Sequence, residues 1–132
     1  MRRPVMTAAL SLAALLSPLA MAHEGHKHDE AKEKASASVT LTGEVLDMSC
    51  FMAHEGKGSD HKKCASKCVL GGTPMGLLTA DGTVYLLLEM HGKDKPYKAA
   101  QQLAGMSAKV TGTKAARGGI TAILLETVEK VK

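Results

Sequence analysis

The chain has 132 residues and a formal net charge of +4, which falls to +2 without Arg2 and Arg3. So small a basic excess argues against a nucleic-acid or membrane-surface role. Its only aromatic residues are one Phe and two Tyr, so any core must be built from aliphatic residues and Met. Because a small domain of this kind buries limited apolar area, we expect a covalent or metal cross-link to contribute to its stability.

The first residues have the pattern of a secretory signal peptide. Arg2 and Arg3 form a short positive region, residues 5–19 are apolar and rich in Ala and Leu, and Ala20-Met21-Ala22 is a small-x-small cleavage site. The apolar run is too short for a comfortable membrane span. We therefore expect residues 1–22 to be removed, leaving a soluble periplasmic or secreted protein that does not associate with membranes.

Cleavage after Ala22 leaves a histidine-rich segment at the new N-terminus. The α-amine and imidazole of His23 can chelate a cation together, and His26 and His28 follow closely. Copper(II), nickel(II) and zinc(II) all accept such nitrogen donors. The composition of residues 23–38 is otherwise that of a disordered leader. A metal-binding leader and a merely solvated one both stay open.

Residues 39–132 have the periodicities of one mainly β domain. Residues 39–46 alternate as a half-buried strand does, and Asp81-Gly82 between two apolar runs predicts a hairpin. Asp94 opens a helix that Gly105 ends. The expected strands are 39–46, 74–79, 84–89, 106–113 and 120–128.

A five-stranded barrel with a helix before its fourth strand is the OB-fold arrangement. We therefore predict a small OB-like barrel, with a short Cys/His helix inserted after the first strand and one further helix. Many OB domains bind single-stranded nucleic acid by stacking bases on aromatic side chains. Such side chains are almost absent here, so nucleic acid is not an expected partner.

All three cysteines lie between the first strand and the hairpin, spaced C-x13-C-x3-C as Cys50, Cys64 and Cys68. With Asp60 as the cap of a short helix, His61, Cys64 and Cys68 fall at i, i+3 and i+7 and share one stripe. Glycines in the loop before this helix allow Cys50, at the end of the first strand, to fold back toward it. The segment thus predicts a site built from thiols and an imidazole.

Thiolates and imidazoles are donors that select copper(I) or zinc. Either His61 or His91, at the end of the third strand, completes a Cys3His set for one soft cation. Lys67 and the helix N-terminus are expected to hold the cysteines as thiolates, whereas His54 is expected to be a solvated loop residue. Export, the histidine-rich start and the methionines favour copper. We predict an exported protein that binds or delivers copper or zinc, with a metal-donor or metal-acceptor protein as partner.

Two alternatives stay open. An exported protein with an odd number of cysteines often has one disulfide and one spare thiol, here Cys50 with Cys64 or Cys68, in a structural or binding domain without metal. A thiol redox protein using Cys64 and Cys68, activated by Lys67, is the enzyme alternative. Otherwise no enzymatic activity is expected, because no oxyanion element or substrate pocket is readable.

The chain resembles a group of small exported bacterial OB-fold-like proteins, mostly uncharacterised, with the pattern D-x-x-C, then H-x-x-C-A-x-x-C-x-x-G-G, then G-L-L. Here the pattern runs from Asp47 to Cys50, from His61 to Gly72 and from Gly76 to Leu78. The resemblance implies an OB-like fold for nearly all of the mature domain and implies no activity. The ligand spacing is also loosely similar to that of periplasmic copper-delivery proteins of the Sco type, although their thioredoxin-like order of strands and helices is not expected here.

Overall fold

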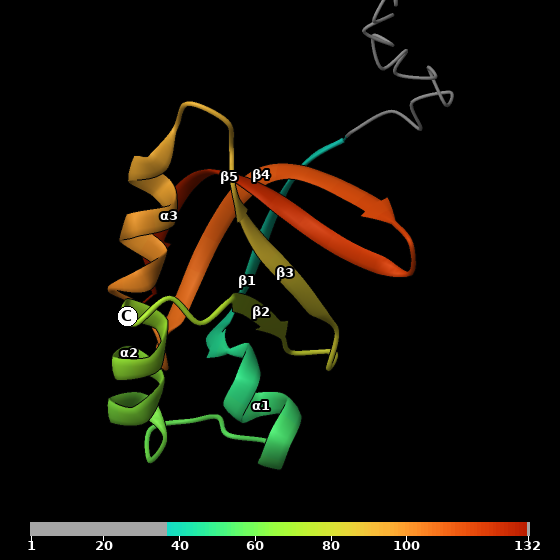
Figure 1. Ribbon diagram of the computed structural model, residues 1–132. Helices are drawn as coiled ribbons and strands as arrows, with labels where there is room; N and C mark the ends of the chain where they lie inside the picture. The colour runs from blue at the N-terminus through green and yellow to red at the C-terminus, as the bar shows by residue number, and fades with distance from the viewer. Residues whose placement is uncertain (1–36, 132) are drawn as a thin grey trace, which may run out of the picture. The chain divides into compact units, whose positions relative to one another are not determined.

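The computed structural model describes residues 37–131, and five strands in this part of the chain close into a barrel in the order β1-β2-β3-β5-β4 (Figure 1). β3 and β5 run parallel, and the other neighbouring pairs are antiparallel. The predicted small OB-like barrel is confirmed. The elements are β1 (Ser38–Asp47), α1 (Met48–His54), α2 (Lys62–Leu70), β2 (Met75–Thr79), β3 (Val84–Glu89), α3 (Asp94–Gln101), β4 (Ser107–Arg117) and β5 (Ile120–Lys130).

The predicted signal peptide and nearly all of the predicted leader, including His23, His26 and His28, lie outside the described residues. The leader was expected to extend to residue 38, but Ser38 already belongs to β1. Within the part of the chain that the structure describes, no helix is both long and apolar enough to span a membrane.

Close approach of neighbouring strands allows the barrel to close. At Gly112 the register between β4 and β5 shifts, and a Cβ there would lie 2.2 Å from the carbonyl oxygen of Leu124. Only glycine permits such a contact. The enclosed core is aliphatic, as the composition predicts, and its buried members are Val45, Ala65, Val69, Met75, Leu77, Leu87, Ala100, Ala104, Ala108, Val110, Ile123 and Leu125.

The predicted hairpin between β2 and β3 is confirmed. The carboxyl oxygen Oδ1 of Asp81 accepts hydrogen bonds from the Thr79 hydroxyl at 2.5 Å and from the Thr83 backbone N–H at 3.2 Å. Gly82 has a φ of 82°, which glycine adopts without strain. The Asp-Gly turn therefore fixes the register of the two strands.

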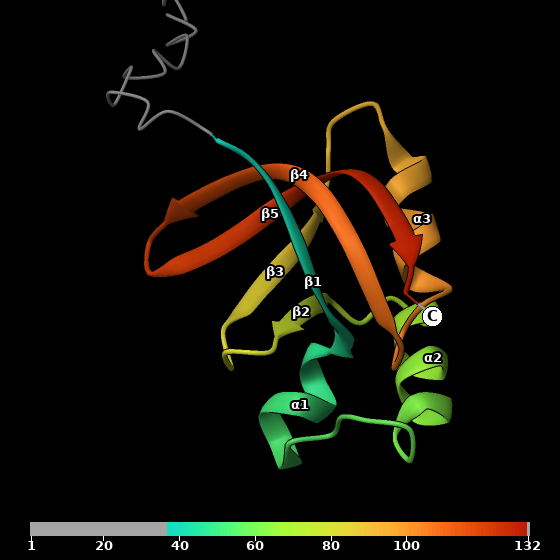
Figure 2. The ribbon, with the colours of Figure 1, turned by 180° about the vertical axis from the view of Figure 1, so that it is seen from behind.

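Within residues 37–131, three helices accompany the barrel rather than the two predicted. α1 and α2 lie side by side at one end of the barrel, and the segment 55–61 joins them, as both views show (Figures 1 and 2). α3 packs beside α2, where the Gln101 amide donates to the Val69 carbonyl oxygen at 3.5 Å. The extra helix is α1, which occupies the stretch where Cys50 was expected to end the first strand and His54 to lie in a loop.

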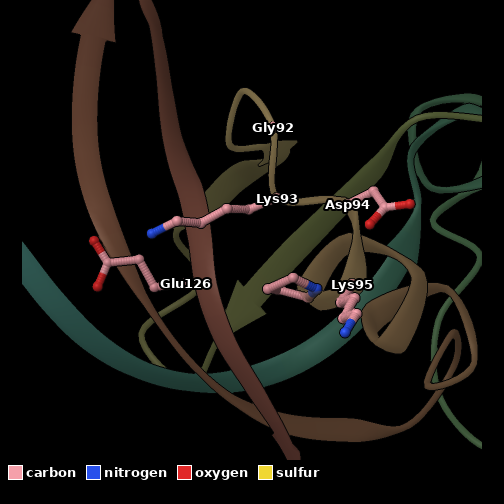
Figure 3. Close-up of a pocket in the computed structure, with 6 residues that line it drawn as sticks. Gly92, Lys93, Asp94, Lys95 and Glu126 are labelled. Atoms are coloured by element: carbon pink, nitrogen blue, oxygen red, sulfur yellow. The ribbon is translucent and has the colours of Figure 1, made fainter.

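A pocket of about 380 Å³ lies at the N-terminal end of α3, where the turn after β3 meets β5 (Figure 3). Four of its six lining residues are of charged types, and none is a cysteine or histidine. It is formed by Gly92, Lys93, Asp94, Lys95, Pro96 and Glu126.

Candidate metal centre

Asp47 is the residue at which β1 becomes α1. Its backbone is extended, and its Oδ1 accepts from the backbone N–H groups of Ser49 at 2.9 Å and Cys50 at 3.4 Å. A side-chain cap of this kind satisfies donors that the first turn of a helix leaves unpaired. Cys50 therefore lies in the first turn of α1, and not at the end of a strand as predicted.

The segment between α1 and α2 is fixed to the barrel. α1 ends at His54, and its C-cap Glu55 has a φ of 54°. The Gly56 N–H donates to the carbonyl oxygen of Cys50 at 3.2 Å. The Gly58 N–H donates to Oε1 of Glu44, on β1, at 2.6 Å. These contacts return the chain toward the barrel, so that α2 starts beside α1.

α2 presents its two cysteines toward α1. The helix begins at Lys62 with His61 as its N-cap, and His61 makes no side-chain cap hydrogen bond. The predicted cap at Asp60 is therefore wrong by one residue. Ala65 and Val69 are buried in the core, and Cys64 and Cys68 each precede one of them. With Ala65 and Val69 packed in the core, the thiols of Cys64 and Cys68 lie close to that of Cys50.

Five side chains form what we call the Cys/His cluster, in two overlapping sets of three. The sulfur atoms of Cys50, Cys64 and Cys68 lie within 4.8 Å of one another, and so do one ligand atom each of Cys50, His54 and His61. Each set is spaced so that it can hold a metal ion. Cys50 belongs to both sets, and all three cysteines are free thiols.

His61 is held by packing. Its ring centroid lies 5.5 Å from that of His54, with the two planes at 71°. A Cβ on Gly56 would lie 2.7 Å from the His61 ring atoms Nε2 and Cε1, so the ring rests on the Gly56 backbone. Nε2 of His61 is buried and has no hydrogen-bond partner within the described residues. Buried polar atoms are normally paired, and this one is therefore available as a ligand.

The predicted ligands are only partly brought together. His61 lies close to Cys50, but among residues 37–131 no single set joins it to all three cysteines. His91 lies in the exposed turn after β3 and belongs to neither set within the described residues. His54, which was expected to be a solvated loop residue, is on α1 and belongs to the second set. A helix that starts after Asp47 places Cys50 and His54 at i and i+4, a spacing that was present in the sequence.

The Asp47 carboxyl controls the charge of the cluster. Asp47 is fully buried, and it raises the pKa of the Cys50 thiol to about 12, with burial as a further cause. The same carboxyl is the main cause of the raised pKa of Cys68, again with burial second. A negative charge nearby opposes the formation of a thiolate. The expectation that Lys67 and the helix N-terminus hold these cysteines as thiolates is therefore wrong.

Asp47 itself stays ionised. Burial alone would raise its pKa, but the thiol and backbone N–H of Cys50, the Cys68 thiol and the Ser49 N–H together hold the pKa below its usual value. Neither thiol has hydrogen-bonding geometry at the buried Oδ2, which has no partner within the described residues. A cation that replaced the thiol protons would face the same negative charge.

No protein-family model matches the chain, and comparisons with curated proteins and with solved structures find no match. The resemblance to small exported OB-fold-like proteins stays a prediction. The function is therefore inferred from the chemistry of the Cys/His cluster.

Proposed function

We propose that this is an exported protein that binds a soft metal ion, copper(I) in preference to zinc(II), and passes it to or receives it from a partner protein. The observation that carries the proposal is the convergence of three free thiols from two helices, with their sulfur atoms within 4.8 Å of one another. Thiolate ligands select soft cations such as copper(I), and zinc also accepts them.

The number of donors favours copper. Zinc in structural sites is held by four protein ligands in a closed tetrahedron, whereas copper(I) is readily three-coordinate. The Cys50, Cys64 and Cys68 set supplies three sulfur atoms, and within the described residues it has no fourth protein ligand at the same spacing. The set is thus better suited to copper(I) than to a structural zinc.

The exposure of the set supports metal exchange. Cys64 is exposed, whereas Cys50 and Cys68 are half-buried. An ion at this set can therefore be reached by a thiol or imidazole of another protein without unfolding of the domain. This arrangement fits delivery or capture of a metal, and the expected partner is a metal-donor or metal-acceptor protein.

The enzyme alternative, a thiol redox protein, is less well supported. Reactive cysteines have lowered pKa values, because the thiolate is the nucleophile. The pKa values of Cys50 and Cys68 are raised instead. Metal binding needs no standing thiolate, since the cation displaces the protons when it binds.

The test combines metal analysis with a free-thiol count on protein recovered from the periplasm. We expect bound metal, no disulfide, and an intact mass equal to that of a chain whose first residue is His23. The reduced protein is then titrated with copper(I) against a chromophoric copper(I) chelator. Cys50→Ser, Cys64→Ser and Cys68→Ser should each weaken binding strongly, whereas the control His91→Ala should retain it. Wild-type affinity in all three cysteine variants would contradict the proposal and favour a disulfide-stabilised domain without metal.

A further inference from the structure

The two sets of ligands in the Cys/His cluster share one atom, the sulfur of Cys50. Cys64 and Cys68 complete one set, and His54 and His61 complete the other. Within the described residues, no set contains members of both pairs. One ion bound by the three cysteines therefore leaves two neighbouring imidazoles beside the same sulfur with nothing to coordinate.

We propose that the cluster holds two copper(I) ions bridged by the Cys50 thiolate, one completed by Cys64 and Cys68 and the other by His54 and His61. This inference rests on the proposed function. A thiolate sulfur has several lone pairs and can bind two soft cations at once. Each ion then has three ligands, a number that suits copper(I) and would leave zinc one ligand short of its usual four.

The charge of the site favours a second cation. Three thiolates and the ionised carboxylate of Asp47 carry four negative charges. A single copper(I) ion leaves three of them uncompensated, and a second copper(I) leaves two. Uncompensated charge near a fully buried group such as Asp47 is costly. The second ion thus lowers the electrostatic cost of assembling the first.

The histidine pair is positioned for this role before any metal binds. The His61 ring lies on the Gly56 backbone with Nε2 buried and without a partner among the described residues. His54 lies in the last turn of α1, where the negative end of the helix dipole favours a nearby cation. One ring is thus held in place, and the other is exposed and free to adjust as it closes the set.

The experiment counts copper ions. It uses the periplasmic protein with His23, His26 and His28 changed to Ala, so that the leader contributes no imidazole. The reduced protein is loaded anaerobically with copper(I) in the presence of a competing chelator and examined by native mass spectrometry. We expect two ions in this background, and one in both His54→Ala/His61→Ala and Cys64→Ser/Cys68→Ser. His54→Ala alone should also bind one ion fewer than the parent protein. Because His54 is exposed, this single change is not expected to disturb the fold, so it shows that the lost ion does not result from misfolding of the double variant.

X-ray absorption provides a second readout. Copper–copper scattering should be present in the parent protein and absent from His54→Ala. Saturation of the parent protein at one ion, or retention of two ions in both histidine variants, would overturn the bridged pair. A single ion that depends on the cysteines would overturn only the bridged pair, whereas the absence of tight copper binding in every protein would also overturn the proposed function.

Discussion

The carboxyl of Asp47 both positions Cys50 and opposes its ionisation. Its Oδ1 accepts a hydrogen bond from the Cys50 backbone N–H at 3.4 Å, and the same carboxyl raises the pKa of the Cys50 thiol to about 12. The cap starts the helix that carries Cys50, and the charge keeps the metal-free thiol protonated. Protonated thiols resist oxidation to a disulfide, so this pairing protects the metal-free cluster against oxidation.

Replacing Asp47 separates the two effects. Asn is as good an N-cap as Asp, so Asp47→Asn should retain α1 while removing the negative charge beside the thiols. We expect the pKa of Cys50 and that of Cys68 to fall, and the thiolate absorbance at about 240 nm to appear at lower pH than in the wild type. Asp60→Asn, an exposed change near the start of α2, is the control. Identical thiol titrations in wild type and Asp47→Asn would contradict the role of the carboxyl.

Metal binding should release protons. Because the pKa of Cys50 is raised to about 12 and that of Cys68 is also raised, both thiols carry protons at neutral pH before the ion arrives. The cation must displace these protons, so the apparent affinity should rise with pH and fall on acidification. Calorimetric titrations in buffers of different ionisation enthalpy measure the number released. A binding enthalpy that is the same in every buffer would show that no proton leaves.

The β2–β3 turn has its own pH dependence. Hydrogen bonds from the Thr79 hydroxyl, and next from the Thr83 backbone N–H, lower the pKa of Asp81 below its usual value of 3.8. A lowered folded-state pKa gives stability that is present above the unfolded pKa and is lost as pH falls through the folded one. The wild type should therefore exceed Asp81→Asn in free energy of unfolding near neutral pH, and this difference should shrink below about pH 4. Denaturant unfolding at several pH values checks this, and a difference that does not vary with pH would contradict it.

The barrel was predictable from the sequence because its signals are local. Alternating apolar residues, the Asp81-Gly82 turn and a helix opened by Asp94 each depend on a few neighbouring residues. The cysteines of α2 were also predictable, since Cys64 and Cys68 share one face of any helix that contains them.

The rest of the cluster depends on contacts between distant segments. α1 depends on the N-cap at Asp47, which apolar periodicity does not reveal, so neither α1 nor the place of His54 was predicted. The raised pKa values of the Cys50 and Cys68 thiols come first from the Asp47 carboxyl, which is far from Cys68 in the sequence. Lys67 is close in sequence to both α2 cysteines, but the Asp47 carboxyl decides the direction in which the pKa of Cys68 shifts.

Gly56 provides a direct test of the histidine half of the cluster. A Cβ at this position would lie 2.7 Å from Nε2 of His61, so Gly56→Ala must displace the ring. We expect the protein to lose the ion assigned to His54 and His61, to retain the ion of the cysteine set, and to be destabilised by about 1–3 kcal/mol, the usual cost of overpacking.

The matched control is Gly58→Ala. Gly58 has a φ of 78°, and a Cβ there would have no atom within 4 Å, so this change strains the backbone by about 1 kcal/mol without touching His61. Copper counts by native mass spectrometry should therefore be one for Gly56→Ala and two for Gly58→Ala, each in the background that lacks His23, His26 and His28. Equal counts in the two variants would show that the position of His61 does not matter for the second ion.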